Sequence, residues 1–245
     1  MFLRLRGCPL RCAWCDTPGS WRLTAEDTVR VASAEGPRRY PSWATPFQAA
    51  CWIAEVEPRE PRTVSVTGGE PLLWPGFIGA LPKMLGGRRL HLETAGGHPR
   101  SLERVLEACD HVSLDLKLPS DMGPVEELPG DAALLEGSLP VDEPAPRDAE
   151  EWRKARRACL ALIAGRDAAA KVVIAGERTA RDFEPLLEDV ARQAPDLPVI
   201  LQPVTPMGGV EAPSLDLLED VLEDARDLGL SVRIVPQVHR ALRVP

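Results

Sequence analysis

Residues 2–17 read Phe-Leu-Arg-Leu-Arg-Gly-Cys-Pro-Leu-Arg-Cys-Ala-Trp-Cys-Asp-Thr. Apolar and basic residues alternate over residues 2–6, a pattern that predicts a short strand. The loop after it carries Cys8, Cys12 and Cys15 in the spacing C-x3-C-x2-C. Cysteine thiolates are the usual ligands of iron–sulfur clusters, and a four-iron cluster normally takes four of them. Three ligands would leave one iron open to another molecule, so the spacing indicates a catalytic cluster rather than an electron-transfer one.

Two other interpretations of the three cysteines stay open from the residues alone. They could form a zinc site that lacks its fourth ligand, or part of a disulfide framework. No histidine or fourth cysteine follows nearby to complete a zinc tetrahedron. The start of the chain lacks the long apolar segment of a signal peptide, so we expect a reducing, cytoplasmic location where disulfides are rare. The cluster is therefore the favoured interpretation.

Composition narrows the class of protein. The chain has 245 residues, 44% of them hydrophobic, which is enough for one domain over residues 1–245. Its net charge of −8 disfavours nucleic-acid binding, and no apolar run approaches the ~20 residues of a membrane span. We therefore expect a small-molecule substrate, with neither nucleic acid nor membrane as a partner. Cys51, Cys109 and Cys159 stand alone in helix-like stretches and are expected to be buried thiols.

Strand-like and helix-like segments alternate along the chain, which is typical of an α/β fold with parallel strands. Strands are predicted at 2–6, 63–67, 89–94, 111–117, 171–175, 198–202 and 231–235. Helices are predicted at 24–35, from Thr45 to Pro58, and at 75–85, 101–109, 148–166, 179–194 and 214–228. About seven strands permit a partial barrel or an open sheet. Residues 119–147 hold six prolines and many acids, so we expect an irregular surface insertion there.

Two of these helices carry more detailed expectations. Thr45 suits the N-cap of its helix, with Phe47, Ala50, Cys51 and Ala54 on one face. In the helix at 101–109 the serine at its start is expected to be the cap.

The cysteine spacing, with Trp14 just before the third cysteine, resembles the radical S-adenosylmethionine (SAM) superfamily. The string at 2–8, followed by Cys15-Asp16-Thr17, is similar to the 7-carboxy-7-deazaguanine synthase family within it. The resemblance implies an open partial (βα) barrel of the radical SAM type. A 4Fe–4S cluster on Cys8, Cys12 and Cys15 would lie at the C-terminal mouth of its strands and bind SAM. It further implies a lyase that converts 6-carboxy-5,6,7,8-tetrahydropterin to 7-carboxy-7-deazaguanine with loss of ammonia, in 7-deazapurine and queuosine biosynthesis.

Several strings resemble the family's SAM-binding motifs. Thr67-Gly-Gly-Glu-Pro71 follows a strand, where glycines let the backbone approach a ligand, although an isolated string of this kind is more often an ordinary turn. Asp115-Leu-Lys117 stands where family members have Ser-Pro-Lys, and a salt bridge is the alternative interpretation. The resemblance implies SAM contacts from Trp14, Cys15, Asp16, Gly68, Gly69, Glu70, Asp115, Lys117 and Gln202.

Other residues resemble the family's substrate site. Arg4 would face the substrate carboxylate and Thr67 would touch the substrate, while Thr17 would bind Mg²⁺ together with substrate oxygens. His239 and the final Pro245 match the family's C-terminal substrate contacts. The alternatives without a role in binding are a solvated Arg4, a hydrogen-bonded turn at Asp16-Thr17 and a structural His239.

One departure from the family concerns the start of the sequence. Family members carry Gln-Gly-Glu-Gly ahead of the first strand to recognise the pterin ring, and this sequence starts within that strand. We therefore expect either a start assigned late or a substrate site that is built differently.

The alternatives in function are another radical SAM enzyme, such as a glycyl-radical-enzyme activase, or a non-catalytic iron–sulfur protein. Expected partners are the pterin and a flavodoxin- or ferredoxin-type reductant, and a homodimer is allowed.

Overall fold

The computed structural model describes residues 1–23, 28–33, 35–41, 43–57, 62–126 and 143–237. Seven strands form one parallel sheet in the order β1-β4-β5-β6-β7-β8-β9. They are β1 (Phe2–Leu5), β4 (Val64–Gly68), β5 (Leu90–Thr94), β6 (His111–Leu116), β7 (Ala168–Ile174), β8 (Val199–Pro203) and β9 (Val232–Ile234). The parallel sheet of seven strands expected from the alternating segments is confirmed.

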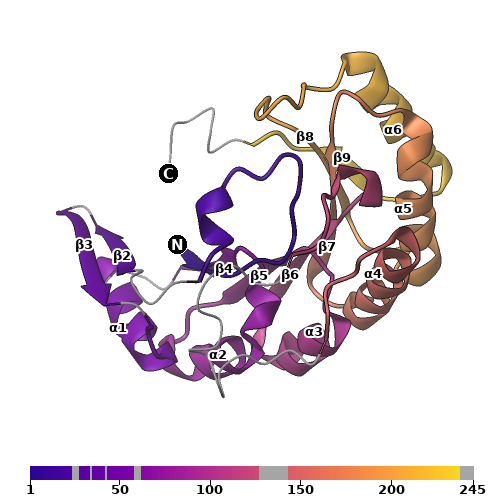
Figure 1. The fold of residues 1–245 in the computed structure, drawn as a ribbon. Helices are drawn as coiled ribbons and strands as arrows, with labels where there is room; N and C mark the ends of the chain where they lie inside the picture. Colours follow the sequence, from indigo (N-terminus) through magenta and orange to yellow (C-terminus); the bar gives the residue numbers. More distant parts are fainter. Residues whose placement is uncertain (24–27, 34, 42, 58–61, 127–142, 238–245) are drawn as a thin grey trace.

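Six helices connect or flank these strands: α1 (Pro46–Val56), α2 (Pro75–Ala80), α3 (Pro99–Val105), α4 (Ala149–Ile163), α5 (Ala180–Gln193) and α6 (Leu215–Asp227). The sheet curves into an arc with the helices on its convex side and the cysteine-bearing segment on its concave side (Figure 1). Its edge strands β1 and β9 do not pair with each other in the described part of the chain, so the barrel is partial.

Apolar and polar residues alternate along the strands, so the two faces of the sheet carry different kinds of side chain. On β5, Leu90 and Leu92 are fully buried in the core under the helices, whereas His91 and Glu93 are partly exposed. Since successive side chains of a strand point to opposite faces, the polar residues lie on the concave face. The concave face of β5 therefore carries polar side chains, while its convex face supplies the core.

The prediction of a helix at residues 24–35 is wrong. Thr28–Ser33 forms β2, which pairs antiparallel with β3 (Gly36–Pro41). Threonine and valine alternate with other residues over β2, a pattern that favours a strand, and Gly36 adopts a φ of 111° at the turn. Residues 24–27 lie outside the described residues. The hairpin packs on α1, where the rings of Tyr40 and Trp52 stack 4.7 Å apart.

Two further expectations about helices need correction. Thr45 caps α1 in a capping box with Gln48, as predicted, but the buried face is Ala49, Ala50 and Ile53. Phe47 is 65% exposed and Cys51 is exposed, so Cys51 is not a buried thiol. Ser101 lies inside α3 rather than at its cap, because Pro99 occupies the first helical position, which suits proline.

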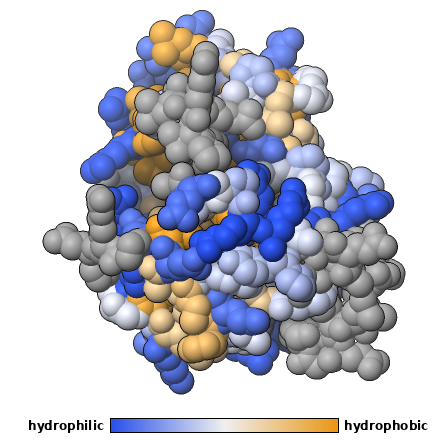
Figure 2. Space-filling view, turned by 90° about the vertical axis from the view of Figure 1, so that its left-hand side faces the viewer, coloured by the Kyte–Doolittle hydropathy of each residue, from blue (hydrophilic) through white to orange (hydrophobic). Residues whose placement is uncertain are grey.

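The side of the molecule that carries the hairpin has a mixed surface. Hydrophilic residues form a band across it, with apolar areas on either side (Figure 2). In the described residues, no helix combines the length and apolar character needed to cross a lipid bilayer.

Candidate active site

The cysteine loop follows β1, is tied at its start to the segment after it, and closes with a turn of its own. The Cys8 amide donates to the Trp21 carbonyl at 3.2 Å, and the Cys15 amide donates to the Cys12 carbonyl at 3.1 Å. Burial raises the pKa of the Cys8 thiol to about 12, and the negative charges of Glu70, Cys12 and Cys15 add to the effect. Burial likewise raises the pKa of Cys12. The three thiols therefore lie within electrostatic range of one another, and Cys8 and Cys12 stay protonated until a metal displaces their protons.

The donor set of the loop, three free thiols, is the one that iron–sulfur clusters take. All six cysteines are free thiols. No three histidine, cysteine, aspartate or glutamate side chains among the described residues are gathered closely enough to hold one metal ion. A zinc site needs its ligands around a single ion. A four-iron cluster instead takes each cysteine on a different iron, so its ligands can stand further apart.

Gly68, at the end of β4, approaches β1 closely, and Gly69, which follows it, approaches the cysteine loop. A Cβ on Gly68 would lie 2.1 Å from the Leu5 carbonyl oxygen. A Cβ on Gly69 would lie 2.4 Å from the Gly7 oxygen and 2.7 Å from the Cys8 Cβ. Only glycine allows this approach, so both glycines are needed for backbone packing whether or not they also contact a ligand.

Glu70 is a buried carboxylate that ties the ends of β4 and β5 together. Its oxygens accept hydrogen bonds from the Leu72 amide at 2.9 Å, the Thr94 hydroxyl at 2.7 Å and the Ala95 amide at 3.0 Å. Burial raises the pKa of this carboxyl in spite of those donors. A carboxylate has about four acceptor sites, so Glu70 retains little capacity for a further partner.

Asp115 lies between two lysines on the concave face. Its two oxygens lie 2.8 Å from Lys117 Nζ and 2.7 Å from Lys171 Nζ. Burial alone would raise the pKa of Asp115, but the two ammonium groups outweigh it and lower that pKa. The salt bridge considered for Asp115 and Lys117 is present, and sequence reasoning missed Lys171. Only the parallel pairing of β6 with β7, which places Lys171 beside Asp115, reveals this third member.

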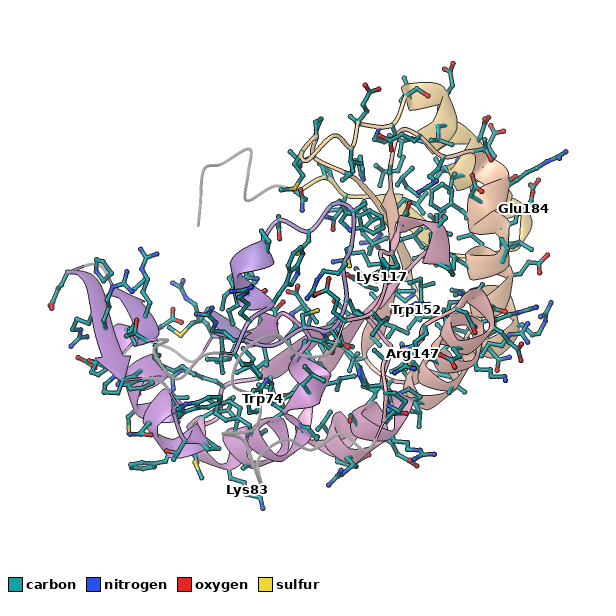
Figure 3. The ribbon with its side chains drawn as sticks, in the orientation of Figure 1. Trp74, Lys83, Lys117, Arg147, Trp152 and Glu184 are labelled. Atoms are coloured by element: carbon teal, nitrogen blue, oxygen red, sulfur yellow. The ribbon has the colours of Figure 1, made fainter. Side chains whose placement is uncertain are left out.

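Lys117 extends this charged group to the cysteine loop. Its Nζ lies 5.7 Å from the centre of the Trp14 ring. Figure 3 labels Lys117 on the inner side of the arc. Trp14 in turn packs against Val173, Ala175 and Val204 at the ends of β7 and β8. Gln202 is half-buried on β8, in register with Val173.

The residues expected at the substrate lie near the end of β1. Arg4 Nη1 lies 3.4 Å from the Thr17 hydroxyl oxygen, and Arg4 is in register with Thr67 on β4. The Thr17 carbonyl accepts hydrogen bonds from the Ser20 amide and hydroxyl, so the expected turn is present. Asp16 is exposed. His239 and Pro245 lie outside the described residues.

The C-terminal segment is fixed just before those two residues. The Thr205 hydroxyl, after β8, donates to Gln237 Oε1 at 2.5 Å. The pair joins the ends of β8 and β9, and so holds the described end of the chain at the mouth of the barrel.

The chain is similar to known proteins over most of its length. The family model of the Radical SAM superfamily matches residues 3–131. A 7-carboxy-7-deazaguanine synthase of Methanopyrus kandleri is 31% identical over 248 residues, covering 98% of this chain and 84% of the relative. One from Geobacter sulfurreducens is 29% identical, covering 98% of this chain and 88% of the relative. The fold is shared with a radical SAM methyltransferase from Sphaerobacter thermophilus, which has a TM-score of 0.60 at 15% identity and covers 96% of this chain and 66% of that one.

Proposed function

The chain belongs to the radical SAM superfamily and, within it, to the 7-carboxy-7-deazaguanine synthase family, and from this membership we propose its reaction. It is a lyase that converts 6-carboxy-5,6,7,8-tetrahydropterin to 7-carboxy-7-deazaguanine with loss of ammonia. The observation that carries the proposal is similarity to named synthases over 98% of the chain. The relatives that match 98% of the chain are named synthases and not glycyl-radical-enzyme activases.

The cysteine loop would hold the 4Fe–4S cluster through Cys8, Cys12 and Cys15. When bound, the cluster and SAM together supply a 5′-deoxyadenosyl radical after one-electron reduction. The protein contributes the position of the three thiols and a site largely shielded from water. Support comes from the 6% exposure of Cys8 and from the close approach of Gly69 to it.

Residues around the loop would bind SAM. The ammonium group of Lys117 suits the carboxylate of SAM, since charge-assisted hydrogen bonds of this kind are strong. Asp115 would hold that ammonium group in place, as their 2.8 Å separation suggests. The remaining contacts would come from Trp14, Cys15, Asp16, Gly68, Gly69, Glu70 and Gln202.

Substrate recognition would be centred on the end of β1. Arg4 would bind the substrate carboxylate, and Thr17 would hold Mg²⁺ together with substrate oxygens and water. The 3.4 Å between these two side chains allows one carboxylate to meet both. Thr67, His239 and Pro245 would complete the site, the last two on the strength of the resemblance alone.

The reaction also needs partners and a setting. Electrons would come from a flavodoxin- or ferredoxin-type protein, and the chain would act as one domain, alone or as a homodimer. We expect it in the cytoplasm, where cysteines stay reduced for cluster assembly.

The test is an anaerobic assay of the reconstituted protein with the pterin, SAM, Mg²⁺ and dithionite. We expect 7-carboxy-7-deazaguanine to form, and SAM cleavage without this product would overturn the substrate assignment. Cys12→Ala should abolish both bound iron and product. Cys51→Ala, which removes an exposed thiol on α1, is the matched control and should preserve both.

A further inference from the structure

Asp121 carries a buried carboxylate beside the cysteine loop. It ends the short 3₁₀ turn Pro119–Asp121, and its side chain is 2% exposed. Its Oδ1 accepts a hydrogen bond from Arg178 Nε at 2.5 Å, while Arg178 Nη2 donates to the Ser120 carbonyl at 3.0 Å. Asp121 Oδ2 is buried and has no hydrogen-bond partner in the described part of the chain. Its contact with Arg178 is therefore the main compensation for burying this carboxylate.

The segment after Asp121 pairs with the cysteine loop like a strand. Cys12 and Met122 form an isolated antiparallel bridge. The Ala13 amide donates to the Asp121 carbonyl at 2.9 Å, and the Gly123 amide donates to the Arg11 carbonyl at 2.7 Å. Residues 121–123 therefore pair with the cysteine loop along one side, where the sequence had suggested only an irregular insertion.

The contacts between this segment and the cysteine loop continue to Glu126. Its amide donates to the Pro9 carbonyl at 3.0 Å, and its carboxylate accepts a hydrogen bond from Arg11 at 2.6 Å. These bonds join residues 121–126 to the loop, but they do not fix either of them to the barrel.

Arg178 provides that attachment. It lies between β7 and α5, in a turn that is itself fixed to the loop before α6. The Gly176 amide donates to the Glu211 carbonyl at 2.9 Å, and the Glu211 amide donates to Glu177 Oε1 at 2.8 Å. A continuous set of contacts thus runs from the α6 side of the barrel through Arg178 and Asp121 to the backbone on either side of Cys12.

We propose that Asp121 and Arg178 are a positioning pair that holds Cys12 where the metal centre needs its sulfur. The inference rests on the proposed function only for the identity of the group that the cysteines bind. The contacts of Asp121 and Arg178 reach the loop through the backbone of residues 121–123, so the pair would act on Cys12 through that backbone.

The test compares two arginine variants of the full-length chain. Arg178→Met breaks the pair beside the loop, and Arg156→Met breaks a similar pair with the buried Asp189, between α4 and α5. In iron-free protein, alkylation of Cys12 by iodoacetamide is measured by mass spectrometry relative to the exposed Cys51. In anaerobically reconstituted protein, the rate of iron loss to a chelator is measured.

We expect Arg178→Met to raise both the Cys12-to-Cys51 alkylation ratio and the rate of iron loss about tenfold. A change of this size corresponds to the loss of one hydrogen bond to a charged group. Arg178→Lys should restore most of the difference, because it keeps a donor for Asp121. Arg156→Met should lower the denaturation midpoint and leave the alkylation ratio at the wild-type value.

Two results would overturn the positioning role. One is a wild-type alkylation ratio in Arg178→Met, and the other is an equal rise in Arg156→Met. If Arg178→Met fails to fold, Asp121→Asn breaks the same contact and is judged by the same ratio. Because alkylation of iron-free protein depends on neither substrate nor product, failure here is distinct from failure of the proposed reaction.

Discussion

The Arg4 guanidinium lies 3.4 Å from the Thr17 hydroxyl, so the end of β1 meets the residue two positions after the last cysteine of the loop. Arg4 is also in register with Thr67 on β4. A cation and two hydroxyls therefore lie near one another beside the cysteine loop. This combination suits an anionic substrate group, with or without a metal ion that shares its oxygens.

Arg4→Gln should weaken substrate binding and leave the metal centre intact. We expect KM for the pterin to rise about tenfold or more, because a charge-assisted hydrogen bond to the carboxylate is lost. Iron per chain and SAM cleavage without substrate should match the wild type. Steady-state kinetics with an iron assay check this, and Arg30→Gln on the hairpin serves as the control. An unchanged KM would remove Arg4 from the substrate site.

Gly69→Ala should disturb the cysteine loop by overpacking it. The new Cβ would lie 2.7 Å from the Cys8 Cβ, so the loop or β4 must shift. We expect the free energy of unfolding to fall by about 1–3 kcal/mol and the iron bound per chain to fall with it. Urea denaturation and an iron assay measure both quantities.

Gly79→Ala is the matched control for that substitution. Gly79 lies in α2, and its added Cβ would meet nothing within 4 Å. Alanine should therefore raise the free energy of unfolding by about 0.5–1 kcal/mol, since glycine is the poorer helix former. Equal iron loss in both variants would contradict a specific role for Gly69.

Asp189→Asn should destabilise the whole fold without touching the active site. Asp189 is 1% exposed and accepts hydrogen bonds from Arg156 at 2.8 Å and Arg157 at 2.7 Å. Removing its charge leaves a buried guanidinium uncompensated, which costs about 3–5 kcal/mol. Urea denaturation should show this loss, whereas Glu107→Gln, which breaks the exposed pair with Arg166, should change little.

Local sequence signals predicted much of this molecule because each element depends on neighbouring residues. Alternation over 89–94 predicted β5, and the Thr45-Pro46 pair predicted the start of α1. The cysteine spacing indicated the kind of centre before any geometry was known. The hairpin of β2 and β3 was not predicted because Thr24, followed by Glu26 and Asp27, is typical of a helix start, whereas β2 depends on its pairing with β3.

Contacts between distant segments had no local signal. Lys171 reaches Asp115 only because β7 lies beside β6. Arg178 reaches Asp121 across 57 positions, and the run of prolines around Asp121 suggested a loop without structure. Such pairs follow from strand order, which periodicity alone does not determine.

Two histidines, His98 buried and His91 partly buried, should make the fold less stable as the pH falls below neutral. His91 lies between Ser65 and Ser113, with ring nitrogens 3.0 Å and 2.8 Å from their hydroxyl oxygens. Burial lowers the pKa of His91 to about 4, and the charges of His111 and Lys171 add to the effect. His98 is 1% exposed, and burial lowers its pKa to about 4 as well.

The direction of the effect follows from proton binding. The pKa of these two histidines is 6.5 in the unfolded chain and about 4 in the fold. At a pH between these values, the unfolded chain binds protons on both histidines and the folded chain does not. The free energy of unfolding therefore falls as the pH drops through this window. The loss at pH 5 should be about 2 kcal/mol for His98 and smaller for His91, which water partly screens. Urea denaturation at pH 7 and pH 5 measures it.

Other groups titrate nearby, so the histidines must be isolated by substitution. Burial raises the pKa of Glu70. Its contribution to the free energy of unfolding therefore grows as the pH falls, opposite to that of the histidines. His91→Gln and His98→Gln should each lower stability at pH 7 and each shrink the difference between pH 7 and pH 5. If that difference stays at the wild-type size in both variants, these histidines take up protons in the folded state, and burial does not hold them neutral.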